Sequence, residues 1–227
     1  MPINKADLDQ FLNQAKVKLV GAADAGLRGE FYDVVSEFLN DTSIWTQDVA
    51  FVAQPSVQSY ALSVNEGQIV RLVGVVNWGT VVPTLNVPTP AGATFVPALM
   101  PEIGTVALAN AFNTTTNLLA TFVTNVAQPT DKHGLPQAPS WLLPIWHVGL
   151  LDGLLGKMMA TPNRPYSNDK QSAYHLRRFR DAIGRARVSK LRANTVGSQA
   201  WRFPQQFRTI SQQGGVPAVG GANERSF

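Results

Sequence analysis

The spacing of the apolar residues changes twice along this chain, and the change limits the folds open to it. Apolar side chains recur at helical spacing over residues 7–40 and again over residues 140–193. Over residues 45–126 they alternate with polar side chains or form short Val- and Ile-rich runs. A period near 3.6 is typical of an amphipathic helix, and a period of two is typical of a strand. The sequence therefore predicts helices on both sides of a β-rich segment.

Four helices are predicted, at about 7–19, 22–40, 140–159 and 169–193. The third is apolar almost all round, and such a helix is buried on most of its sides. The fourth is expected to face a core with four residues, Tyr174, Ile183, Ala186 and Leu191. We predict that the helices pack as a four-helix bundle, with the β-rich segment inserted between the second and the third. The predicted fold class is α+β, with an extended C-terminal arm.

Strands are predicted at about 45–51, 59–64, 68–76, 81–87, 104–109 and 118–126. Prolines recur between residues 83 and 101, and proline cannot donate a hydrogen bond to a neighbouring strand. Residues 82–101 are therefore interpreted as a long, weakly charged loop or a β-excursion; such loops usually make contacts or carry function. The predicted organisation is helices 1 and 2 at 1–44, the β-rich insertion at 45–127, helices 3 and 4 at 128–194 and the arm at 195–227.

Charge is distributed unevenly along the chain. Residues 160–210 hold eleven basic and two acidic residues, a formal charge of +9, whereas the whole chain carries +4. Between Leu72 and Thr130 the only charged residue is Glu102. Charged residues make up 15% of the chain, against about 25% in ordinary soluble domains. The basic segment favours an anionic partner, and the low charge elsewhere favours association with other proteins.

Residue types that most catalytic and metal sites require are scarce. The chain has no cysteine and three histidines, which excludes disulfides and thiolate metal sites and argues against structural zinc. Phosphate-binding glycine loops, nucleophile elbows and zinc-protease motifs are also missing from the sequence. We therefore expect neither enzyme activity nor a cofactor. No apolar run approaches the roughly 18 residues of a membrane span, so the chain is expected to be soluble and cytoplasmic.

Asp152 and two histidines are the remaining candidates for chemistry. His147 is expected to pack within the third helix, and His175 precedes a basic run with no obvious carboxylate to orient it. Asp152 lies in the apolar third helix, where an ion pair with an arginine of the fourth helix is the favoured interpretation. Catalysis by Asp152 and His147 is the weaker alternative, because a lone carboxylate lacks a second acid or a metal.

The fourth helix carries the strongest electrostatic signal. Arg178, Arg185 and Arg192 repeat every seven residues and therefore share one face of the basic helix 170–192. Such a face could neutralise phosphates, which makes a nucleic-acid-binding module one hypothesis. A face that is solvated or paired with acidic partners is the alternative.

The arm carries a short aromatic and basic motif that includes Trp201, Arg202, Phe203, Pro204 and Phe207. Aromatic and arginine side chains commonly anchor protein interfaces. The motif is therefore expected to dock either on its own subunit or on a neighbour.

Short motifs spread over about residues 5–208 carry a resemblance to a known family. They are Glu37-Phe38-Leu39-Asn40 with Trp45, Ser56-Val57-Gln58-Ser59-Tyr60-Ala61-Leu62, Gly67-Gln68-Ile69-Val70-Arg71-Leu72, Leu151-Asp152-Gly153-Leu154-Leu155-Gly156-Lys157-Met158-Met159, Pro165-Tyr166-Ser167 and Tyr174-His175-Leu176-Arg177-Arg178-Phe179-Arg180. In the predicted chain order, helices enclose a β-rich insertion and an extended arm follows. This order and the motifs together resemble the head-to-tail adaptor (connector, or tail-tubular) proteins of tailed bacteriophages.

The resemblance implies a structural virion protein. Such adaptors form a ring, twelve-fold to match the portal, through which genomic DNA passes without being read in sequence. The resemblance implies that the helices and the arm dock on the portal ring, while the insertion faces a tail or nozzle protein. The implied location is the head-to-tail junction of the virion, with the host cytoplasm during assembly and no membrane. We expect the isolated chain to be a monomer.

Overall fold

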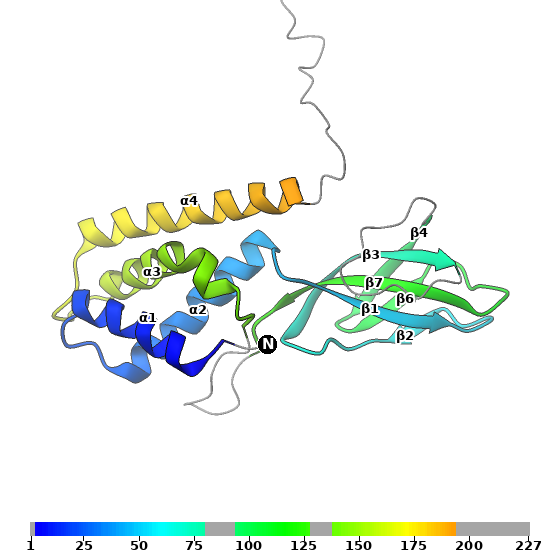
Figure 1. Ribbon diagram of the computed structural model, residues 1–227, viewed down its shortest axis with the longest axis horizontal. Coiled ribbons are helices and arrows are strands. Elements are labelled where there is room, and N and C mark those ends of the chain that lie inside the picture. The colour runs from blue at the N-terminus through cyan, green and yellow to red at the C-terminus, as the bar shows by residue number, and fades with distance from the viewer. Residues whose placement is uncertain (1–2, 80–93, 128–137, 194–227) are drawn as a thin grey trace, which may run out of the picture. The chain divides into compact units, whose positions relative to one another are not determined.

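The computed structural model describes residues 3–79, 94–127 and 138–193 of the chain (Figure 1). These residues form four helices and seven strands. The helices are α1 (Lys5–Lys18), α2 (Asp24–Thr42), α3 (Leu142–Ala160) and α4 (Asp169–Ala193). The chain divides into two units, Met1–Arg192 and Ala193–Phe227.

The strands form two antiparallel sheets, one with the order β1-β7-β3-β4 and one with the order β2-β6-β5. Their bounds are β1 (Thr46–Ala53), β2 (Ser59–Ala61), β3 (Gln68–Gly79), β4 (Thr94–Val96), β5 (Ala98–Glu102), β6 (Thr105–Leu108) and β7 (Thr116–Asn125). Buried side chains of both sheets, among them Val75 and Phe122 of the first and Val106 of the second, form one apolar core. The two sheets therefore pack against each other.

Two short strands lie where the sequence favoured a loop. β4 and β5 fall within the predicted loop 82–101 or directly after it, and each is the edge strand of its sheet. Pro97 separates the two strands, and Pro101 lies within β5. At residues 94–96 and 98–101 the loop interpretation is wrong and the alternative of a β-excursion is right. An edge strand tolerates proline, which cannot donate to the ladder. The remainder of the predicted loop, up to residue 93, lies outside the described residues.

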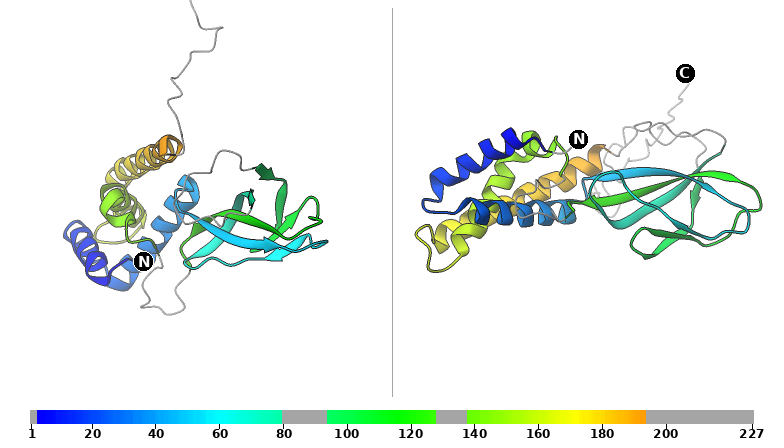
Figure 2. Two further views of the ribbon diagram at one scale, coloured as in Figure 1. Left: turned by 45° about the vertical axis from the view of Figure 1, so that its right-hand side comes forward. Right: turned by 90° about the horizontal axis from the view of Figure 1, so that it is seen from below.

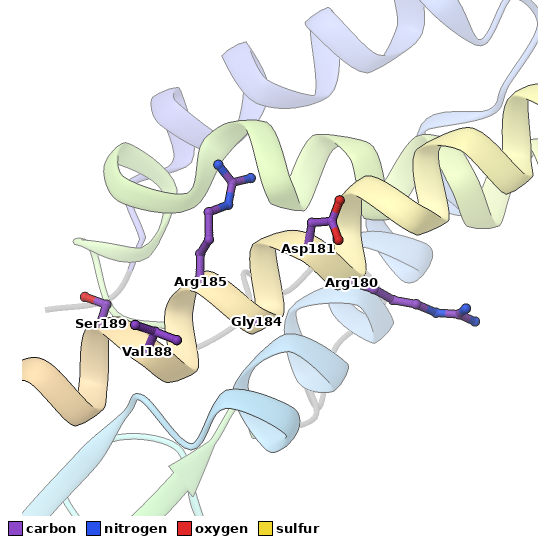
Figure 3. Close-up of a pocket in the computed structure, with 6 residues that line it drawn as sticks. All are labelled: Arg180, Asp181, Gly184, Arg185, Val188 and Ser189. Atoms are coloured by element: carbon purple, nitrogen blue, oxygen red, sulfur yellow. The ribbon is translucent and has the colours of Figure 1, made fainter. Parts of the chain in front are cut away.

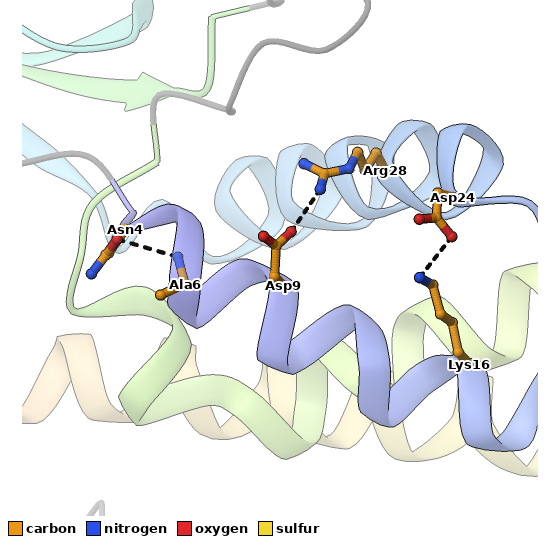
Figure 4. Close-up of polar contacts among 6 residues, drawn as sticks. All are labelled: Asn4, Ala6, Asp9, Lys16, Asp24 and Arg28. Carbon is orange, nitrogen blue, oxygen red and sulfur yellow. Dashed lines mark hydrogen bonds and ion pairs between the residues drawn. The ribbon is translucent and has the colours of Figure 1, made fainter.

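Polar contacts fix the start of α1 and join it to α2 (Figure 4). The side-chain oxygen of Asn4 accepts a backbone hydrogen bond at the first turn and caps α1. Arg28 lies 2.6 Å from Asp9, and Lys16 lies 2.7 Å from Asp24. Both pairs are partly exposed, so each stabilises the helix pair by at most about 1 kcal/mol.

α3 occupies a central position among the helices. α1 and α2 both pack on it, and α4 lies on another side (Figures 1 and 2). Gly149, Gly153 and Gly156 of α3 allow the close approach of α4, because a Cβ atom at each would lie under 3.0 Å from an α4 side chain. At Gly153 the added atom would meet Val34 of α2 and Phe179 of α4, both at 2.8 Å. Three helices therefore meet at this glycine.

The prediction of a four-helix bundle is wrong. In such a bundle each helix packs along its length against its neighbours around a shared core and keeps one face in solvent. α3 is exposed near its start, at Ile145 and Val148, but no residue from Gly149 to Met159 is exposed, so this part of the helix has no solvated face. It is covered instead by α1, α2 and α4. With four helices and two antiparallel sheets, the described chain is a mixed α+β protein.

Candidate functional site

α4 presents one face to α3 and the opposite face to solvent. Its buried residues follow the spacing of a single helix face: Ser172, His175, Phe179, Ala182, Ile183 and Ala186. The predicted core positions of Ile183 and Ala186 are confirmed. Those of Tyr174 and Leu191 are wrong, since these side chains are 56% and 70% exposed. The buried face of α4 includes the polar residues Ser172 and His175, so the apolar residues alone do not mark this face.

One of these polar residues, His175, belongs to a hydrogen-bonded cluster with Asp152 of α3. Asp152 Oδ1 lies 2.8 Å from His175 Nδ1, and Asp152 Oδ2 lies 3.1 Å from Arg178 Nε. Arg178 Nη1 also donates to the Tyr174 hydroxyl at 3.2 Å. That hydrogen bond, together with the charge of Asp152, raises the pKa of Arg178. The predicted ion pair between Asp152 and an arginine of the fourth helix is confirmed.

The expectation that His175 lacks a carboxylate partner is wrong, because the fold brings Asp152 to it from α3. The side chains of both residues are at most 8% exposed, so a substrate has little access to the pair. Ser172 adds a second tie between the helices by donating to the Gly156 carbonyl at 2.7 Å. The cluster therefore fastens α4 to α3 through polar contacts in an otherwise apolar interface.

His147, the predicted alternative partner of Asp152, takes part in a different contact. Its ring meets Phe11 of α1 edge-on, with the ring centroids 5.2 Å apart. It lines a hollow of about 250 Å³ between α1 and α3, together with Asp7, Gln10, Phe11, Gln14, Leu143 and Pro144. Across residues 3–79, 94–127 and 138–193, no three His, Asp or Glu side chains gather closely enough to hold a metal ion.

The arginines of the predicted basic face of α4 do not share one environment, because, among the described side chains, these contacts engage Arg178 alone. Arg178 is held by Asp152, whereas Arg185 is exposed and makes no ion pair with the described part of the chain. The side chain of Arg192 lies outside the described residues. Arg185 borders a hollow of about 690 Å³ that is also lined by Arg180, Asp181, Gly184, Val188 and Ser189. Figure 3 shows Arg180 and Arg185 pointing to opposite sides of the helix.

A second group of cations lies at the C-terminal end of α2. Arg187 Nε donates to the Asp41 carbonyl at 2.7 Å, and Lys190 Nζ donates to the Ser43 carbonyl. Arg71 of β3 donates from Nη2 to the Ser43 hydroxyl at 2.7 Å. Burial, followed by the charge of Arg71, lowers the pKa of Lys190. No sequence pattern reveals this group, because its members come from segments far apart in the chain.

The predicted interface motif of the arm, Trp201, Arg202, Phe203, Pro204 and Phe207, lies outside the described residues. Its docking therefore stays a prediction.

Compared with known proteins, the chain matches no protein-family model, and no curated protein is similar to it. The resemblance to phage adaptors therefore also stays a prediction. Within the described ranges, every helix is too short or too polar to cross a bilayer.

Proposed function

We propose that this chain is a structural virion protein that joins the portal of a tailed phage to its tail, in a ring that DNA can pass through. The proposal includes twelve copies per ring, to match the portal. It also assigns docking on the portal to the arm at 195–227, with Trp201 and Phe203 as its anchors.

The observation that carries the proposal is the number of large apolar side chains that the single chain leaves in solvent. Ten are more than half exposed in the described ranges: Val17, Val20, Val73, Phe95, Leu99, Ile103, Ile145, Val148, Tyr174 and Leu191. Single exposed apolar residues are normal, but neighbouring ones mark surfaces that another molecule covers. Ile145 and Val148 stand one turn apart on α3, and Phe95 lies at a sheet edge, so several faces are suited to contacts with other subunits.

The polar chemistry of the chain also supports a structural role. The Asp–His pair, the arrangement that would orient a catalytic base, is buried and holds two helices together. The low share of charged residues, 15% of the chain, favours association. Both features suit a protein that acts by being held between larger assemblies.

The test is the mass of the chain measured alone, and again after mixing with the portal ring of the same phage. We expect a monomer alone and twelve copies on each portal ring in the mixture. A portal ring whose mass does not change would overturn the proposal. A chain that ends at Asn194 should keep its melting temperature and lose portal binding, and the full chain with Trp201→Ala and Phe203→Ala should do the same.

If the shortened chain still binds the portal, the arm is not the docking element. The matched control is the full chain with Gln212→Ala, a change in the arm outside the interface motif, which should bind as the parent does.

A second candidate function is a nucleic-acid-binding module. The observation in its favour is a set of three arginines of α4, Arg177, Arg180 and Arg185, which are exposed and form no ion pair with described residues. Binding through such a face weakens as salt rises, because counterions leave the nucleic acid when cations contact its phosphates. Absence of salt-dependent binding to DNA by the parent chain would exclude this function.

A further inference from the structure

The end of α2 collects more positive charge than its own structure needs. Arg71, Arg187 and Lys190 reach it from β3 and from two positions on α4. Their partners there are two backbone carbonyls and one hydroxyl, all without formal charge. None of the three forms an ion pair with a carboxylate of the described residues.

Capping of the helix explains part of this arrangement. A cation near the last carbonyls of a helix satisfies unpaired acceptors and complements the negative end of the helix dipole. Arg187 and Lys190 each serve one carbonyl, whereas Arg71 contacts only a hydroxyl and is not needed as a cap. Arg71 and Arg187 are also exposed, so that their remaining N–H groups face solvent. Burial, and after it the charge of Arg71, lowers the pKa of Lys190.

We infer that Arg71, Arg187 and Lys190 form an anion site at the C-terminal end of α2, and that its ligand is a phosphate group of a nucleic-acid backbone. A phosphate placed between them would offset the repulsion between Arg71 and Lys190. The two planar guanidinium groups can each donate two parallel hydrogen bonds to phosphate oxygens, and the ammonium adds a compact charge beside them.

A row of further cations favours a polymer of phosphates over the carboxylate of a partner protein. Arg180 lies seven residues before Arg187, so it stands on nearly the same flank of α4, roughly 10 Å along the helix axis. Arg177 lies one turn before Arg180 and is also exposed. A linear polyanion can contact this row and the cluster at once, whereas a single acidic side chain cannot. The inference rests on the contact with DNA that both proposed functions involve.

The test measures the binding of a labelled DNA duplex of mixed sequence between about 50 and 200 mM salt. The logarithm of affinity falls with the logarithm of salt by about 0.9 for each phosphate contact. The variant with Arg71→Gln, Arg187→Gln and Lys190→Gln should therefore lose about two to three units of slope, and at least about tenfold in affinity at the lowest salt. The matched control removes three exposed cations elsewhere, with Lys5→Gln, Lys18→Gln and Arg164→Gln, and should change the slope by at most about one unit.

An unchanged slope in the triple variant would overturn the inference, and so would a control variant that loses as much slope as the triple variant. Displacement of the duplex by poly-glutamate at a lower concentration than unlabelled duplex would assign the site to an acidic protein instead. Because the cluster also caps α2, melting temperatures are measured alongside. If the triple variant does not fold, Arg71→Gln alone, which leaves both α4 cations in place, should lose about one unit of slope.

The adaptor proposal is judged by a different measurement. A chain that joins the portal ring but does not bind the duplex overturns the phosphate site and leaves the adaptor standing. A chain that binds the duplex through this cluster but does not join the portal overturns the adaptor and leaves the phosphate site standing.

Discussion

The contact between α3 and α4 at Gly149 can be tested by adding a single methyl group. A Cβ atom at Gly149 would lie 2.6 Å from Cβ of Ala182, whereas carbon atoms in contact are normally about 3.5–4.0 Å apart. Ala182 has no side-chain rotation that could relieve the overlap. Gly149→Ala therefore forces the two helices apart by roughly 1 Å, or strains them where they are.

The magnitude follows from two opposing effects. Alanine stabilises a helix by about 1 kcal/mol relative to glycine, and overpacking of a core costs about 1–3 kcal/mol. Because the opposing methyl group is fixed to the backbone, we expect the upper part of that range and a net loss of about 2 kcal/mol. Gly29→Ala in α2 is the control: nothing lies within 4 Å of its added atom, so it should gain about 1 kcal/mol.

Urea unfolding of the two variants measures the difference, which should be about 3 kcal/mol. The double variant Gly149→Ala with Ala182→Gly restores the space for the methyl group and should recover part of the loss, as a coupling between the two positions. The reasoning fails if Gly149→Ala stabilises the chain as much as Gly29→Ala does, because the helices would then have no close contact at this point.

Three further outcomes follow from individual contacts. Burial raises the pKa of Glu30, so the protonated carboxyl suits the folded state better than the ionised one. As pH rises and the carboxyl ionises, the folded state loses stability. Glu30→Gln, which cannot ionise, should therefore raise the melting temperature at pH 7 and leave it unchanged near pH 4. Asp152→Asn leaves the buried ring of His175 or the guanidinium of Arg178 without its acceptor, and chemical unfolding should show a loss of about 1–3 kcal/mol. Phe95→Ser should change the free energy of unfolding by at most about 0.5 kcal/mol, since Phe95 is 80% exposed. Sedimentation of this variant mixed with the portal should show weaker assembly. A large drop in melting temperature would mean that Phe95 belongs to the fold.

The local elements of this chain could be predicted from the sequence because their signals are local. All four predicted helices begin and end within two residues of α1, α2, α3 and α4. A helix repeats its apolar face every three or four residues, so a window of one or two turns is enough to reveal it. β4 and β5 were harder to predict, since prolines at an edge strand look the same as prolines in a loop.

The arrangement of the helices could not be predicted in the same way. Glycines at 149, 153 and 156 weaken a helix by their propensity, and nothing in their spacing says which helix approaches them. Their purpose becomes visible only when Ala182, Phe179 and Leu176 are placed opposite them. The all-round apolar character of α3 indicated burial, but it did not distinguish a bundle from a central helix covered by three others.

The basic helix shows why a stripe of charge in the sequence does not define a site. Arg178, Arg185 and Arg192 share a face of an isolated helix, but long side chains turn toward the nearest acceptors that the fold provides. Asp152 engages Arg178, and the carbonyls of Asp41 and Ser43 at the end of α2 engage Arg187 and Lys190. Arg71 joins them because β3 begins beside that helix end, and no periodicity of α4 could include it. The residues whose removal should most change the response of DNA binding to salt are therefore ones that lie outside the heptad stripe.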